Sequence, residues 1–136
     1  MFKKLLPLLL VLFSSKVMAY EFPIEIIEYI DDIKIFAYLD KNDINEKAKW
    51  TPLKSPPPLS IHQALQAVQK YIRSHENFTR APLISIELKQ IPHHKNYWHY
   101  LVKVRVTADG KAQPHFFVVM MDGKVVSALR EPEAIK

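Results

Sequence analysis

The sequence YWHYLVKVRVTADGKAQPHFFVVMMDGKVVSAL spans residues 97–129 and predicts two or three consecutive antiparallel β-strands. Between Trp98 and Thr107 one set of alternate positions is apolar and the other is mostly polar, which is typical of a strand with one buried face. An apolar run at residues 116–121 ends at Asp122-Gly123, a pair that predicts a tight turn because both positions need a positive φ. The expected strands are residues 98–107, 116–121 and 124–129.

The expected sheet has apolar side chains on both faces. With Asp122 and Gly123 as the two central turn residues, Met120 faces Val125 on one side, and Phe117 lies on the other. One helix covers only one side of a sheet. The second side is therefore covered either by residues 24–39 or by a partner protein. The apolar content of residues 24–39 favours the first alternative.

The residues before this stretch supply flanking strands and a connector. Residues 20–32 fit a strand or a short helix, and we favour a strand or an extended lead-in. Residues 33–39 carry apolar side chains on both faces, which indicates a strand inside a sheet. Residues 45–58 are rich in proline and form a stiff, extended connector.

One helix is expected after the connector. Ser60 is a good N-cap, and Gln63 completes a capping box ahead of an apolar stripe with helical spacing. A half-buried strand follows at residues 84–89, and residues 108–114 form a loop with Asp109-Gly110 at its tip. The sequence therefore predicts an α+β fold, an antiparallel meander sheet of about four to five strands packed against one main helix.

The first 19 residues predict an export signal. Lys3 and Lys4 precede a short apolar run, and residues 17–19 form a small-x-Ala cleavage site. The apolar run of about ten residues is shorter than the roughly 20 that span a bilayer, which favours a cleaved signal over an anchor. Cleavage leaves residues 20–136 as a single domain without a stable membrane span, and the basic signal and missing cysteines favour a bacterial periplasm, or secretion.

Charge and composition exclude several functions. Removal of Lys3, Lys4 and Lys16 lowers the net charge from +5 to +2, which leaves little support for nucleic-acid binding. The sequence contains only two glycines and no cysteine, so it offers no phosphate-binding loop, no nucleophile elbow and no thiol nucleophile. Asp31-Asp32 is better explained as a charged turn than as a catalytic pair. We therefore expect neither a catalytic site nor a cofactor.

The six histidines of the chain are its strongest indication of a chemical site. If Val106 pairs near His115, the same strand register brings His99 towards Asp122. A candidate metal cluster would then form at one end of the sheet. Its members would be His93, His94, His99 and Asp122. Because a His-His pair in a polar turn is usually just exposed, we assign no metal to this cluster.

Three segments resemble the PepSY-like family. They are PPLSIHQALQA (57–67), WHYLVKV (98–104) and VMMDGKVV (119–126), which match a Ser-x-x-x-Ala helix start, a Tyr-x-Val strand and a final Asp-Gly hairpin. The resemblance covers about residues 57–129. It implies a small, non-catalytic exported module that binds or restrains a peptidase or another envelope protein, and it supplies no catalytic residues.

The sequence therefore favours a periplasmic binding or inhibitory module whose partner is an envelope protein. The candidate contact surface is an aromatic and basic strand face of Tyr97, His99, Lys103 and Arg105. Two alternatives remain, a toxin-neutralising protein of the immunity type and a His-based periplasmic metal-binding protein.

Overall fold

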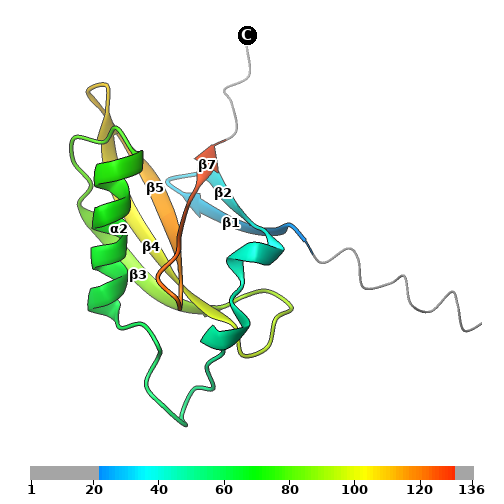
Figure 1. Ribbon diagram of the computed structural model, residues 1–136. Helices are drawn as coiled ribbons and strands as arrows, with labels where there is room; N and C mark the ends of the chain where they lie inside the picture. Colours follow the sequence, from blue (N-terminus) through cyan, green and yellow to red (C-terminus); the bar gives the residue numbers. More distant parts are fainter. Residues whose placement is uncertain (1–21, 131–136) are drawn as a thin grey trace, which may run out of the picture.

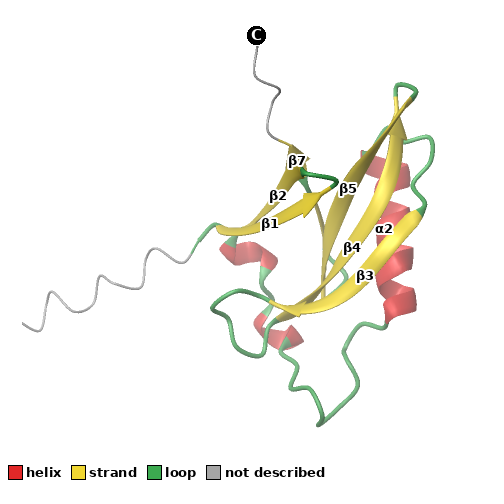
Figure 2. Ribbon diagram, turned by 180° about the vertical axis from the view of Figure 1, so that it is seen from behind, coloured by secondary structure: helices red, strands yellow, loops and turns green. Residues whose placement is uncertain are grey.

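The computed structural model describes residues 22–130 of the 136-residue chain, so the predicted signal peptide, residues 1–19, lies outside the described residues. Three layers make up the described part: a helix, a four-stranded sheet and a three-stranded sheet (Figure 1). Helix α2 (Ile61–His75) covers one face of the larger sheet, and the smaller sheet covers the other face (Figure 2).

Both sheets are antiparallel. The larger sheet has the order β3 (Leu83–Gln90), β4 (Trp98–Ala108), β5 (Lys111–Met120) and β6 (Val125–Ser127). The smaller sheet has the order β1 (Ile24–Ile30), β2 (Ile33–Leu39) and β7 (Leu129–Arg130), and two 3-10 helices, Lys41–Asp43 and Glu46–Ala48, follow β2.

The predicted α+β class is confirmed, and β3 to β6 form an antiparallel meander against one main helix. The strands belong to two sheets, however, and not to one as predicted. The chain bends at Ala128, where it stops pairing with β5 and starts pairing with β2. The last predicted strand therefore divides into β6 and β7, which belong to different sheets.

The first hydrophobic core lies between α2 and the larger sheet. Ser60 begins the helix as predicted, because its Oγ accepts a hydrogen bond from the Gln63 N–H at 3.1 Å and the Gln63 side chain accepts one from the Ser60 N–H at 2.9 Å. Ala64 and Val68 are the buried helix residues. The sheet residues in this core are Tyr100, Val102, Val104, Val106, Phe117, Val119 and Met121.

The second core lies between the two sheets. Leu101 on β4 and Phe116 on β5 pack with isoleucines of β1 and β2, including Ile26 and Ile35. Full burial of one such side chain contributes about 1.5–3 kcal/mol relative to exposure. Residues 24–39 thus form two strands that cover the second face of the sheet, as their apolar content predicts.

Two-residue turns fix the register of two hairpins. Asp31-Asp32 connects β1 to β2 with φ values of 52° and 62°. Asp109-Gly110 connects β4 to β5 with φ values of 52° and 76°. The loop predicted at residues 108–114 is therefore much shorter than expected, and β5 begins at Lys111.

The hairpin after β5 has a three-residue loop. Gly123 has a φ of 91°, its N–H donates to the Met120 carbonyl at 2.9 Å, and the Met120 N–H donates to the Lys124 carbonyl at 2.8 Å. A glycine with positive φ after a tight turn adds one residue to the loop. Val119 therefore pairs with Val125, and the predicted pairing of Met120 with Val125 is wrong by one residue.

The proline-rich connector is anchored to the start of β4 at two points. The Trp50 ring packs edge-on against Trp98 with 5.4 Å between centroids, and its Nε1–H donates to the Ser55 carbonyl at 2.9 Å. The Tyr100 hydroxyl donates to the Leu59 carbonyl at 2.6 Å. These contacts fix where α2 starts relative to the larger sheet.

Candidate functional site

The contact surface predicted from the sequence does not form one exposed face. Its members are Tyr97, His99, Lys103 and Arg105, and the last three lie on the side of β4 that packs against the smaller sheet. His99 is only 2% exposed, so its predicted place on an exposed surface is wrong. Tyr97 is half-buried, and Lys49 Nζ lies 5.5 Å from the centre of its ring.

The two basic residues of the predicted surface form ion pairs with other residues of the chain. Lys103 Nζ lies 3.1 Å from Glu87 Oε1 and 3.5 Å from Glu28 Oε2, and Arg105 Nη2 lies 2.7 Å from Asp31 Oδ2. Burial lowers the pKa of Lys103, but hydrogen bonds and charges from Glu87 and Glu28 outweigh burial and raise the pKa above its usual value. The pairs with Glu28 and Asp31 join β4 to the β1–β2 hairpin, and the pair with Glu87 joins β4 to its neighbour β3.

The candidate metal cluster of His93, His94, His99 and Asp122 is not assembled. The observed register places His99 opposite Met120, on the buried face of β4. The His94 ring has a separate contact, with its Nδ1 2.9 Å from the Pro92 carbonyl oxygen. In the part of the chain that the structure describes, no group of three or more His, Cys, Asp or Glu residues could hold a metal ion.

His99 is a buried imidazole whose two ring nitrogens have no hydrogen-bond partner among residues 22–130. Burial and, to a smaller extent, the positive charge of Lys89 lower the pKa of His99 to about 4, against the opposing effect of Glu28. The ring is therefore neutral at physiological pH. Its position and charge state suit a packing role rather than proton transfer.

A second buried histidine belongs to a polar network that the sequence did not predict. His115 Nε2 lies 2.9 Å from Ser127 Oγ, and the Ser127 hydroxyl donates to Glu76 Oε1 at 2.8 Å. Burial, with a smaller contribution from the charge of Arg130, lowers the pKa of His115 to about 4. The three residues line a cavity of about 520 Å³.

This Glu76–Ser127–His115 network differs from a nucleophilic triad. In a triad the carboxylate holds the histidine, and the histidine accepts the serine proton. Here the serine hydroxyl donates directly to Glu76, so the His115 Nε2–H must donate to Ser127 Oγ and has no lone pair for the serine proton. The network ties the end of α2 to β5 and β6.

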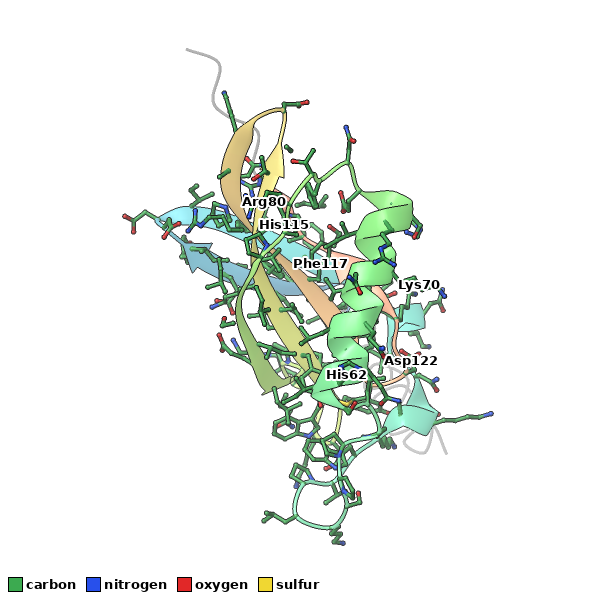
Figure 3. The ribbon with its side chains drawn as sticks, turned by 90° about the vertical axis from the view of Figure 1, so that its left-hand side faces the viewer. His62, Lys70, Arg80, His115, Phe117 and Asp122 are labelled. Atoms are coloured by element: carbon green, nitrogen blue, oxygen red, sulfur yellow. The ribbon has the colours of Figure 1, made fainter. Side chains whose placement is uncertain are left out.

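A groove lies beside α2 because the helix is too narrow to cover the whole sheet. A helix with its side chains is about 10–12 Å wide, and neighbouring strands lie about 4.8 Å apart. Helix α2 contacts β4, β5 and β6, and β3 remains at the edge of the sheet. Figure 3 looks onto the helix, with His62 near its lower end and Arg80 beside the strands to its left, level with its upper end.

Two cavities fill the space between α2 and β3 and share His62. The first has a volume of about 500 Å³ and lies beside the start of β3, with apolar walls from Leu65, Ile72, Phe78 and Leu83. The second has a volume of about 440 Å³ and lies beside the end of β3; its apolar walls are Pro57, Ile61, Ile86, Leu88 and Tyr100. We refer to the two cavities and the residues that line them as the α2–β3 groove.

Strand β3 presents both apolar side chains and an unpaired backbone edge to this groove. It pairs with β4 on one side and has no strand partner on its other side among residues 22–130. A bulge at Ile84 shifts the alternation, so that Leu83, Ile86 and Leu88 face α2. Leu83 is 48% exposed and Leu88 is 38% exposed, although the sequence predicted a half-buried strand.

The charged residues that line the groove are all basic. Arg73 in the last turn of α2 and Arg80 just before β3 line the first cavity together with His62, and neither cavity is lined by Asp or Glu. No acidic side chain of residues 22–130 forms an ion pair with Arg73 or Arg80. One end of a groove with mostly apolar walls is therefore cationic.

Comparisons with protein-family models, with curated proteins and with solved structures give no match to this chain. Among residues 22–130, no helix combines the length and the apolar character that crossing a membrane requires.

Proposed function

We propose that this chain is a non-catalytic, exported binding module of the PepSY-like type, and that it binds an envelope or periplasmic protein through the α2–β3 groove. The order of one helix followed by an antiparallel set of strands is compatible with the resemblance of residues 57–129 to that family. The proposal replaces the contact surface predicted on β4 with one on the opposite side of the larger sheet.

One observation carries the proposal: an eight-residue edge strand with exposed apolar side chains lies beside two apolar cavities. An unpaired edge strand is a template for pairing with another chain. The bulge at Ile84 and the charges of Glu87 and Lys89 blunt this edge in part, but its apolar side chains stay exposed. Exposed apolar surface next to a cavity is also typical of protein contact sites.

The test is a capture experiment with the full chain, carrying a C-terminal tag and expressed in its own cells. The groove variant is Leu83→Lys. The matched control is Leu129→Lys, because Leu129 is also a strand leucine, is 54% exposed and lies outside the groove. We expect one envelope protein to be captured by the wild type and the control and to be lost with the groove variant.

Capture that is equal for both variants, or lost only with Leu129→Lys, would contradict the proposal. The identity of the captured protein then separates restraint of a peptidase from neutralisation of a toxin. Circular dichroism of each variant checks that the substituted residue has not changed the fold.

A further inference from the structure

We infer that the occupant of the α2–β3 groove is an extended polypeptide segment that adds to β3 as a fifth strand, places apolar side chains in both cavities and ends in a carboxylate beside Arg73 and Arg80. This inference rests on the proposed function, because it specifies the partner of the same site. It goes beyond that function by stating the chemistry that the groove recognises.

The backbone of β3 favours an extended segment. An added strand forms main-chain hydrogen bonds with the free edge whatever its sequence, and pockets for alternate side chains supply specificity. Strand β3 is eight residues long, which at about 3.3 Å per residue gives an edge of roughly 26 Å. A helix offers no free backbone groups for this edge, so it would leave the hydrogen bonds of β3 unused.

The cavities define the spacing of apolar side chains in the added strand. Leu83 lies at the first cavity, and Ile86 and Leu88 lie at the second. Because alternate residues of a strand point to the same face, an added strand beside these three positions directs residues i, i+2 and i+4 towards α2. Its other residues face away from the helix and are free to be polar.

Arg73 and Arg80 define the charge expected at one end of the bound segment. Arg73 and Arg80 line the first cavity, beside the start of β3, and have no acidic partner among residues 22–130. Guanidinium groups pair with carboxylates through two parallel hydrogen bonds, which are stronger than neutral ones. An Asp, a Glu or a chain terminus at that end of the segment satisfies both charge and geometry.

A second copy of this chain fits the groove less well. If β3 of one copy paired antiparallel along the whole of β3 of another, the end of one strand would meet the start of the other. Leu83 of one copy would then lie opposite Gln90 of the other, so Arg80 would lie near residues 91–93 of the other copy. The segment 88–93 of a second copy contains no carboxylate to pair with Arg80.

The experiment is a selection of displayed heptapeptides of random sequence on the immobilised full chain, followed by fluorescence anisotropy of the enriched peptides. We expect apolar residues at i, i+2 and i+4, and Asp or Glu at one end. Changing the acidic residue of an enriched peptide to lysine should weaken its binding about tenfold.

Charge reversal in the protein tests the assignment of the basic end. The variant with Arg73→Glu and Arg80→Glu should prefer the lysine-ended peptide. A control with Lys70→Glu and Lys111→Glu changes the net charge equally at exposed residues outside the groove and should keep the acidic preference. Neither arginine has an ion pair in the described chain, so the reversal should leave the fold intact.

The outcomes separate this inference from the proposed function. Enriched peptides that lack the alternation or the acidic end, yet lose binding with Leu83→Lys, would overturn the inference and leave the groove as the binding site. Peptides that bind Leu83→Lys as well as the wild type would overturn both. Failure to enrich any peptide, or a dimer of the chain that Leu83→Lys dissociates, would overturn the inference in favour of another occupant.

Discussion

His99 should make the folded protein sensitive to acid. The pKa of a histidine in an unfolded chain is about 6.5, whereas burial lowers the pKa of His99 in the fold to about 4. Above pH 6.5 the ring is neutral in both states and contributes no pH dependence. Between pH 6.5 and pH 4 only the unfolded chain takes up the proton, so the free energy of unfolding falls as the pH falls.

The magnitude follows from the size of the pKa shift. Each pKa unit corresponds to about 1.4 kcal/mol, so a shift from 6.5 to about 4 predicts a loss of about 3 kcal/mol at pH 4. His99→Leu should abolish this loss. At neutral pH the same substitution should leave the stability unchanged or raise it by about 1 kcal/mol, because no ring nitrogen stays buried without a partner.

Urea unfolding followed by tryptophan fluorescence, at a series of pH values from neutral to pH 4, measures the effect. Trp50 and Trp98 both pack against the core and report on folding. His62→Leu is the matched control, because the His62 side chain is exposed, and it should keep the pH dependence of the wild type. If His99→Leu loses as much stability as the wild type between pH 6.5 and pH 4, the reasoning is refuted.

Three further changes test the packing of the fold. His115→Gln should remove a second loss of about 3 kcal/mol over the same pH range, because burial also lowers the pKa of His115 to about 4, and the same urea series measures it. Leu101→Ala should lower the free energy of unfolding by about 3 kcal/mol, because this side chain is fully buried between the sheets and its removal leaves a cavity. Ser60→Ala should lower it by about 1 kcal/mol, because α2 loses its N-cap; urea unfolding at neutral pH checks both values.

Matched controls sharpen these three tests. Leu129→Ala and Gln69→Ala change exposed residues and should alter the stability by less than about 0.5 kcal/mol. A loss at Leu101 no larger than that at Leu129 would contradict the packing of the smaller sheet on β4. An unchanged pH dependence with His115→Gln would mean that the His115 ring charges in the fold without penalty.

Local patterns in the sequence predicted most elements of this fold. Ser60 and Gln63 predicted the start of α2 because a capping box is a short-range signal. The hairpin at Asp122-Gly123 was predicted too, but not its register. Whether Gly123 is a central turn residue or the extra residue of a three-residue loop depends on one hydrogen bond, from the Met120 N–H to Lys124.

Long-range packing explains the predictions that were wrong. His99 was expected on a solvent-exposed face because Lys103 and Arg105, on the same face of the strand, are charged. Only Leu101, between His99 and Lys103, indicated that this face is covered. Both charged residues instead pair with carboxylates from the β1–β2 hairpin, which are more than 70 positions away in the sequence. No local pattern reports such a contact.

The α2–β3 groove could be predicted only in part. The apolar residues Leu83 and Ile84 were visible in the sequence, and Arg80 beside them has no acidic neighbour along the chain. The sequence did not show that β3 is an edge strand or that α2 lies over β4 and β5, because both depend on how distant segments pack. Similarly, Glu76, His115 and Ser127 meet only in three dimensions.

Photo-crosslinking in the cell tests most directly whether a partner protein lies along β3. Benzoylphenylalanine would replace either Ile84, which is 46% exposed at the edge of β3, or Tyr29, which is 68% exposed on the smaller sheet. We predict that irradiation of the full chain gives one discrete adduct with an envelope protein from position 84 and none from position 29. An adduct from position 29 alone, or the same adduct from both positions, would contradict the assignment of the α2–β3 groove as the binding site.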